Sequence, residues 1–226
     1  MKKIMFNDRF GLTDAVLAGH KTMTRRIVHA NNVIQIETSD GAVHNVERKF
    51  GSYHEYKDKD GKIWLAWSPF KIGEVIAVAQ SYSCINKHGL IIDDAKGSLR
   101  HSAGWSNKMF VKADLMPHRI RITNIKVERL QDISNEDCRK EGIINLEWKQ
   151  WLEQDITTFL RRNTSYGTFG RCRSLGIMEP FAESEPDEYL ATDPHTAFAV
   201  LIFKLMSRET WEQNPWVFAY EFELIE

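Results

Sequence analysis

The most regular pattern of apolar and polar positions lies at residues 119–130, where isoleucine and valine alternate with Arg, Thr, Lys and Glu. This alternation predicts a half-exposed strand, because successive side chains of a strand point to opposite faces of the sheet. A nearly continuous apolar run at 71–82 predicts a buried strand introduced by a turn at Gly73. The run at 216–225 predicts a final strand.

The N-terminal part of the chain alternates between short strands and a helix. Residues 4–6 predict a short first strand, and the apolar spacing at 8–18 predicts a helix. Gly19 follows where a left-handed cap would end that helix. Residues 22–28 are rich in β-formers and predict the next strand.

Three further helices and one hairpin follow from local signals. A hydroxyl cap at Ser134 and an acidic first turn predict a short helix closed at Gly142. The patterns at 148–160 and 196–206 predict two more helices. The dipeptide at 60–61 (Asp-Gly) is a strong turn signal and predicts a hairpin.

Strands dominate this pattern, with short helices between them. We therefore expect an α+β fold, and a small β-barrel decorated by helices rather than a βαβ sheet. We expect one domain over 1–226, in which the polar segments 29–70, 84–112 and 147–195 are peripheral insertions. Limited proteolysis should cut those segments before it cuts the predicted strands.

Composition narrows the range of partners. The 226 residues are 42% hydrophobic and 27% charged with a net charge of −1, so any nucleic-acid binding must come from a local basic patch. The cysteines at 84, 138 and 172 show no CxxC spacing, which indicates neither a disulfide framework nor a metal site. We expect no cofactor. No apolar run approaches the ~20 residues of a membrane span and no signal peptide is visible, so we expect a cytoplasmic protein without a membrane partner.

The segment AGHKTMTRR at 18–26 carries the densest candidate chemistry. A threonine hydroxyl becomes a nucleophile only when a base removes its proton, and a lysine serves as that base only when its amine is neutral. Lys21 lies three residues before Thr24, and the positive charges of Arg25 and Arg26 favour a lowered lysine pKa. The alternative is an exposed basic strand end in which Lys21 is solvated.

The same strand also offers groups that could hold a ligand. In an extended chain Thr22, Thr24 and Arg26 share one face. We expect Thr22, Arg25 and Arg26 to bind the substrate, since guanidinium and hydroxyl groups suit an anionic or carbonyl-bearing ligand.

Glu141 ends the short helix that begins after Ser134. A carboxylate there faces the negative end of the helix dipole, which raises the cost of ionising it and suits a proton donor. The alternative is a solvated glutamate at a helix end.

A second basic segment lies at 156–178, which contains no acidic residue. Arginines interleaved with aromatic residues suit base stacking and phosphate contact, so these side chains are candidate RNA contacts. The alternative is neutralisation by the acidic residues that follow, up to Asp193. The arginines concerned are Arg161, Arg162, Arg171 and Arg173.

The segment AGHKTMTRR is similar to the GxKxxTxR signature of ASCH-domain proteins, a branch of the PUA-like superfamily. KIGEVIAV, LMPHRIRITNIKVERLQDISNEDCRKEGI and WEQNPWVFAYEFELI resemble the successive core segments of phage- and prophage-type members. The resemblance implies a PUA-like small β-barrel and a relationship to an N4-acetylcytidine amidohydrolase. It also implies Lys21 as general base, Thr24 as nucleophile and Glu141 as proton donor.

We therefore expect a hydrolase that removes an acyl group from a modified nucleoside, with N4-acylated cytidine as the substrate and Arg26 at the oxyanion or orienting the ligand. The alternative is a non-catalytic module that binds RNA or a modified base. The enzyme requires a closed pocket in which Lys21, Thr24 and Glu141 converge within hydrogen-bond reach. We expect these three residues and Arg26 to line one cavity. The binding module requires an open basic groove continuous with the 156–178 segment.

Overall fold

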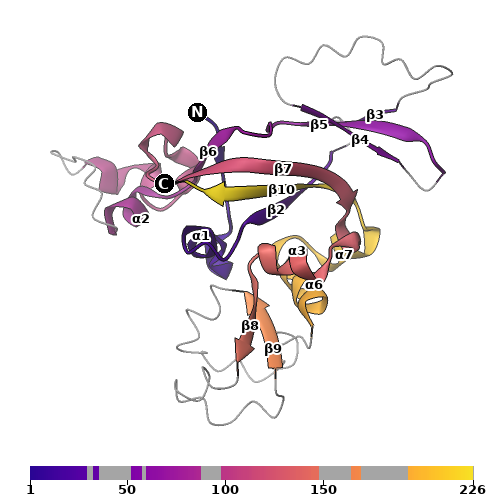
Figure 1. Cartoon of the computed structure of the whole chain (residues 1–226). Coiled ribbons are helices and arrows are strands. Elements are labelled where there is room, and N and C mark those ends of the chain that lie inside the picture. Colours follow the sequence, from indigo (N-terminus) through magenta and orange to yellow (C-terminus); the bar gives the residue numbers. More distant parts are fainter. Residues whose placement is uncertain are drawn as a thin grey trace.

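A five-stranded sheet is the centre of the molecule (Figure 1). The computed structural model describes residues 1–29, 33–35, 52–57, 60–87, 98–147, 164–168 and 193–225. The strands follow the order β1 (Lys3–Ile4), β6 (Val75–Val78), β7 (Arg119–Arg129), β10 (Trp216–Leu224) and β2 (Met23–Ile27). β1 and β6 pair in parallel, and the other pairs are antiparallel.

Two smaller sheets and several helices surround the central sheet. The first small sheet has the order β3 (Val33–Gln35), β5 (Ile63–Ser68) and β4 (Ser52–Lys57). The second pairs β8 (Ile143–Glu147) with β9 (Thr164–Thr168). The helices are α1 (Leu12–Leu17), α2 (Tyr82–Lys87), α3 (Asn135–Lys140), α6 (Pro194–Leu205) and α7 (Arg208–Gln213). Short 3₁₀ turns lie at Asp8–Phe10, Ser98–His101, Ala103–Trp105, Lys108–Phe110, Ala113–Leu115 and Leu130–Asp132.

The predicted α+β class is confirmed, but the strand pairing does not form the expected closed barrel. In the described part of the chain, β1 and β2 remain the two outer strands of the central sheet. β1 has two residues and pairs only with β6 there, so it offers few backbone groups that could join it to β2.

A bulge in the long strand β7 changes the phase of its apolar alternation. Ile120 and Ile122 are buried at even positions, whereas Ile125 is buried at an odd position. The register against β10 shifts between Glu221 and Phe222, which leaves one extra residue, Thr123, on β7. A bulge of one residue exchanges the two faces, because the side-chain period of a strand is two. The apolar side chains therefore stay on the core side along the whole strand.

Most of the predicted elements are present, with shifted ends. The predicted strands at 22–28, 71–82, 119–130 and 216–225 correspond to β2, β6, β7 and β10. The predicted helices at 134–142 and 196–206 correspond to α3 and α6, and the 60–61 turn joins β4 and β5.

Two helix predictions differ from the structure or cannot be compared with it. The helix expected at 8–18 is divided, because Gly11 takes φ 63° between a 3₁₀ turn and α1. The helix expected at 148–160 lies outside the described residues. α7 was not predicted, although a serine cap at Ser207 begins it.

The segments expected to be peripheral contribute to the core where the structure describes them. Ala66 of β5 is fully buried in the main core, and Tyr56 of β4 packs there too. Ile85 and Val111 belong to a second apolar cluster beside β6. These residues of the segments expected to be peripheral therefore pack in the core.

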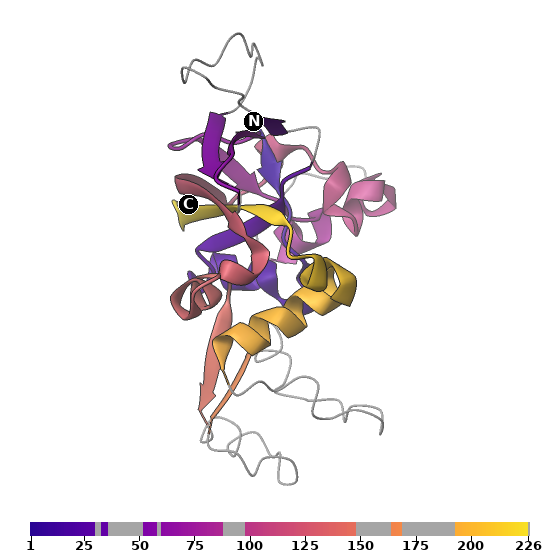
Figure 2. The same cartoon turned by 90° about the vertical axis from the view of Figure 1, so that its right-hand side faces the viewer.

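The C-terminal helices gather at one end of the sheet, where α3 and α6 lie on the same side of it (Figures 1 and 2). α6 begins with an Asp193 cap that accepts a hydrogen bond from the Thr196 N–H, and it buries Phe198, Leu201 and Ile202. Among the helices the structure describes, none combines the length and the apolar character that crossing a membrane requires.

Candidate functional site

Lys21 is placed by the turn that ends α1. The Gly19 N–H donates to the Val16 carbonyl and the His20 N–H donates to the Ala15 carbonyl, and Gly19 has φ 74°. This is the Schellman arrangement that the sequence predicted at Gly19. The chain then reverses, and the Thr22 N–H donates to the Lys140 carbonyl at the end of α3. Lys21 therefore lies before β2 begins and beside the C-terminus of α3.

Glu141 is placed by the cap of α3. Ser134 accepts a hydrogen bond from the Asp137 N–H at the start of the helix, and Glu141 forms the cap at its end. Gly142 then turns the chain with φ 93°, and a Cβ added to it would lie 3.4 Å from Lys21 Cβ. A side chain at this position would be strained by the positive φ, and its Cβ would be in ordinary van der Waals contact with Lys21.

Lys21 and Glu141 form a buried ion pair across 120 residues of sequence. Lys21 Nζ lies 2.5 Å from Glu141 Oε2 and donates to the Glu141 carbonyl oxygen at 2.8 Å. The two side chains are 2% and 5% exposed. Burial lowers the pKa of Lys21, whereas its contact with Glu141 opposes that shift.

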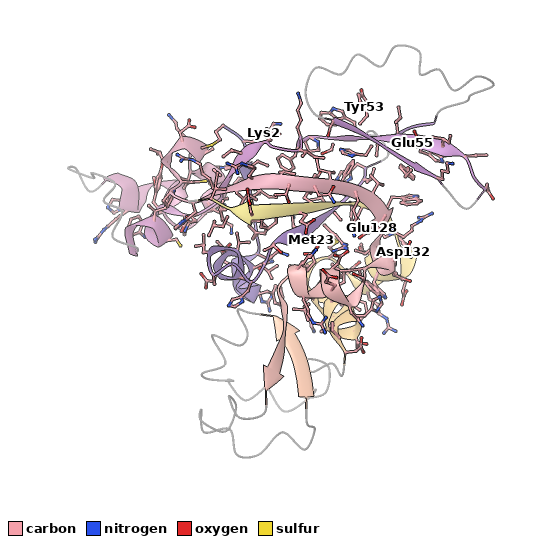
Figure 3. All side chains as sticks on the ribbon, in the orientation of Figure 1. Lys2, Met23, Tyr53, Glu55, Glu128 and Asp132 are labelled. Carbon is pink, nitrogen blue, oxygen red and sulfur yellow. The ribbon has the colours of Figure 1, made fainter. Side chains whose placement is uncertain are left out.

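Arg25 contacts three carboxylates on the other side of Glu141. It donates to Glu141 Oε1 at 3.0 Å through Nη1, to Glu128 Oε1 at 3.0 Å through Nε, and to Asp137 Oδ2 at 3.3 Å through Nη2. Lys126 completes the cluster at 2.5 Å from Asp137 and 3.0 Å from Glu128. Figure 3 shows Glu128 at the end of the sheet that lies close to α3. We call Lys21, Arg25, Lys126, Glu128, Asp137 and Glu141 the buried charge network.

The buried charge network balances three cations against three carboxylates. Burial opposes ionisation of Asp137, but hydrogen bonds from Lys126 and the charge of Arg25 outweigh it and lower the pKa of Asp137. Burial also raises the pKa of the neighbouring Cys138 thiol to about 12, so this cysteine stays protonated at neutral pH.

Thr24 and Arg26 come from β2, which forms one edge of the sheet. Thr24 pairs with Tyr220 of β10, and Arg26 pairs with Phe218. Arg26 donates to the Met5 carbonyl oxygen, and burial lowers its pKa from that of an exposed arginine. No ion pair joins Arg26 to a carboxylate among the described residues. The charge of Glu141 nevertheless acts on Arg26 and partly offsets the effect of burial on its pKa.

These side chains meet in a cavity of about 290 Å³. One wall is polar and consists of Asn7, Lys21, Thr24, Arg25, Arg26 and Glu141. The other is apolar and consists of Met5, Phe6, Leu12, Phe198, Leu201, Ile202, Leu205 and Met206. The predicted convergence of Lys21, Thr24, Arg26 and Glu141 in one cavity is thus confirmed.

Arg25 and Thr22, which we expected to bind the substrate, are not placed with free polar groups facing the cavity. Arg25 reaches the cavity, but its side chain is 2% exposed and its guanidinium is occupied by carboxylates. Thr22 is half-buried and is not among the described residues that line the cavity; its backbone carbonyl accepts from the Phe222 N–H. The four candidate RNA-contacting arginines, Arg161, Arg162, Arg171 and Arg173, lie outside the described residues.

Sequence reasoning missed three members of the buried charge network. Asp137 was assigned only to the acidic first turn of α3, and Lys126 and Glu128 only to the polar face of a strand. The signal was present in β7, because the phase change after Ile122 moves Lys126 and Glu128 onto the face opposite Ile125. Arg25, the common partner of Asp137 and Glu128, could not be identified from a local pattern, because it lies 103 residues from Glu128 in the sequence.

Among the described residues no group of three or more His, Cys, Asp or Glu side chains is placed to hold a metal ion. Comparisons with protein families, with curated proteins and with solved structures find no match for this chain.

Proposed function

We propose that this protein is an amidohydrolase that removes an acyl group from a modified nucleoside, with N4-acylated cytidine as the substrate, on a PUA-like fold of the ASCH type. The observation that carries the proposal is the meeting of Lys21, Thr24, Arg26 and Glu141 in one cavity. A threonine near a buried lysine whose pKa is lowered is the arrangement that nucleophilic catalysis by a hydroxyl requires.

The 2.5 Å contact between Lys21 Nζ and Glu141 Oε2 supports the division of roles. One proton moved from Lys21 to Glu141 converts the ion pair into a neutral amine and a neutral acid, with no change in the proton count of the pair. Lys21 is then the base for the Thr24 hydroxyl, and Glu141 is the proton donor for the leaving group.

The reaction proceeds in two halves. Thr24 Oγ1 attacks the acyl carbon as Lys21 takes its proton, and Arg26 stabilises the oxyanion that develops. The carbon–nitrogen bond then breaks, and the exocyclic nitrogen takes a proton from Glu141 and leaves as the amine. Water hydrolyses the acyl ester on Thr24, which releases the carboxylate and restores the hydroxyl.

The size and walls of the cavity support a small ligand. A volume of about 290 Å³ is near the lower end of the ~300–1,000 Å³ typical of small-molecule sites, which suits one nucleobase and its acyl group. The apolar wall from α6 offers a surface for the flat base or the acyl group, and the polar wall offers groups for the carbonyl and the amine.

The test is to incubate the protein with N4-acetylcytidine and to measure cytidine release by mass spectrometry. We expect Thr24→Ala to lower kcat at least ~1,000-fold, because the nucleophile is removed. Affinity for the substrate, measured by calorimetry, should stay close to wild type, since the rest of the cavity remains.

Thr22→Ala is the matched control, because Thr22 is two residues away on the same chain segment but outside the cavity lining. It should keep both turnover and affinity. Turnover that survives in Thr24→Ala and is lost in Thr22→Ala would assign the nucleophile to Thr22. Binding without turnover in the unmodified protein, across a series of acylated nucleosides, would favour a module that binds a modified base or RNA.

A further inference from the structure

Two adjacent arginines of β2 have opposite surroundings. The guanidinium of Arg25 contacts three carboxylates, and its side chain is 2% exposed. The guanidinium of Arg26 donates to one backbone carbonyl, that of Met5, and lines the same cavity. The N–H groups of Arg25 are already occupied, so Arg25 has no donor left for a ligand. Arg26 has no carboxylate partner among the described residues, so it keeps N–H donors that a ligand can use.

The sheet itself directs Arg25 away from the ligand. Arg25 pairs with Ala219 on β10, and Ala219 pairs with Lys126 on β7, so the three residues form one row across the sheet. The small side chain of Ala219 lets Arg25 extend over β10 to reach Glu128 of β7. The ring of Phe198 from α6 lies 5.7 Å from the guanidinium carbon and covers it.

The contact of Arg25 with Glu141 makes the two carboxylate oxygens unequal. Arg25 Nη1 donates to Oε1 at 3.0 Å, and Lys21 Nζ lies 2.5 Å from Oε2. Arg25 holds Oε1 and does not release its proton. In the proposed reaction, Oε2 is therefore the oxygen that exchanges a proton with Lys21. Rotation of the carboxylate would break both contacts at once.

We infer that Arg25 is a positioning residue that holds the Glu141 carboxylate with Oε2 against Lys21. Glu128 and Asp137 hold Arg25 itself in place. Of the two arginines, only Arg26 contacts the ligand. This inference rests on the proposed function for its kinetic consequence. Its structural consequence, the fixed orientation of Glu141, does not depend on turnover.

The kinetic test compares Arg25→Lys with Arg26→Lys, which keep the charge and differ only in which arginine is replaced. An ammonium cannot donate to three carboxylates in the geometry of a guanidinium, so Arg25→Lys leaves Glu141 misplaced. We expect kcat on N4-acetylcytidine to fall by about 100-fold with KM nearly unchanged, the size of effect seen when a reacting group is displaced by about 1 Å. Arg26→Lys should also lower kcat, because Arg26 stabilises the oxyanion, and it should raise KM as well, because Arg26 contacts the ligand.

The structural test uses crystal structures of Arg25→Gln and Arg26→Gln. In Arg25→Gln the Glu141 carboxylate should lose the contact that holds Oε1 and rotate about its contact with Lys21, whereas Arg26→Gln should keep the orientation seen here. Because Arg25→Gln leaves buried carboxylates with one cation fewer, Arg25→Gln/Glu128→Gln restores the charge balance and provides a second variant that folds if the single one does not.

The outcomes separate this inference from the proposed function. A raised KM with unchanged kcat in Arg25→Lys, or an unmoved Glu141 carboxylate in Arg25→Gln, would overturn the positioning role. Wild-type protein without turnover on any acylated nucleoside would overturn the proposed function, and the crystal structures would still decide the role of Arg25.

Discussion

At the scale of single residues, burial has a strong effect on the protonation of Lys21. Its side chain is 2% exposed, so water cannot solvate the ammonium, and one carboxylate and one carbonyl replace that solvation. Burial lowers the pKa of Lys21 more strongly than Glu141 raises it. The same shift that makes a neutral amine accessible for catalysis makes the protonated form unfavourable in the folded protein.

This shift predicts how stability depends on pH. Because the pKa of Lys21 is below 10.5 in the folded protein, the unfolded chain binds more protons between the folded value and 10.5. The contribution of Lys21 to the free energy of unfolding should therefore increase as pH rises through this range. Urea unfolding of wild type and Lys21→Met, from pH 7 to 10, should give a difference that grows with pH.

The exposed Lys112 provides the control for this measurement. Lys112→Met should give a difference from wild type that stays nearly constant over the same range. Equal pH dependence in the two variants would show that burial does not shift the titration of Lys21.

At the scale of elements, the site depends on how two helices end. Gly19 lies in the turn after α1 and Gly142 in the turn after α3, and the two turns are joined by the hydrogen bond from the Thr22 N–H to the Lys140 carbonyl. Gly142 combines φ 93° with a close approach to Lys21, so its lack of a side chain serves both the turn and the site.

Gly142→Ala should therefore lower stability and activity together. The left-handed conformation costs a residue with a side chain roughly 1–2 kcal/mol. The strained turn directly follows Glu141, so a shift that relieves the strain should move Glu141 and lower turnover. Thermal unfolding and hydrolysis of N4-acetylcytidine measure the two effects.

Gly61→Ala is the matched control, because Gly61 has φ 77° and open space around it. It should lose stability by a similar amount and keep full turnover. Loss of turnover in both variants would mean that the effect comes from stability alone.

At the scale of the whole molecule, the small sheet of β3, β4 and β5 is joined to the central sheet by a buried contact. Ser68 at the end of β5 is fully buried, and its Oγ lies 3.0 Å from Tyr220 Oη of β10. Burial raises the pKa of Tyr220 to about 12, so this hydroxyl remains protonated at neutral pH. Tyr220 is also the cross-strand partner of Thr24, which connects this contact to the site.

A double-mutant cycle should show that the two sheets unfold together. Ser68→Ala and Tyr220→Phe each remove one hydroxyl, and their coupling energy should be about 0.5–1.5 kcal/mol, the net value of a typical hydrogen bond. Urea unfolding followed by fluorescence and by circular dichroism should give coincident transitions. Additive effects, or separate transitions, would mean that the small sheet is an independent unit.

The sequence predicted local features better than contacts between distant segments. The cap at Gly19, the cap at Ser134 and the alternation of β7 each depend on residues within about one turn or a few strand positions, so each could be identified. The order of the strands depends on pairings between segments far apart, and the expected barrel closure was wrong for the described strands.

The candidate site shows the same division. The positions of Lys21, Thr24 and Glu141 in one cavity were predicted from motifs, and the structure brings them together. The saturation of Arg25 could not be predicted, because its three carboxylate partners are 103 to 116 residues away in sequence. The local sequence shows that position 25 is an arginine, but it does not show how many carboxylates contact that arginine in the folded protein.

The 120 residues between Lys21 and Glu141 also determine when the site comes into existence during folding. Contacts between distant segments form late, because the entropy of closing a long loop is lost before the contact compensates for it. The cavity also needs α6, which begins at Pro194, so a nascent chain cannot complete the site until most of its length has been synthesised. The proposed hydrolysis would therefore report a late step of assembly, and a chain stalled before α6 would carry the AGHKTMTRR motif without a complete cavity.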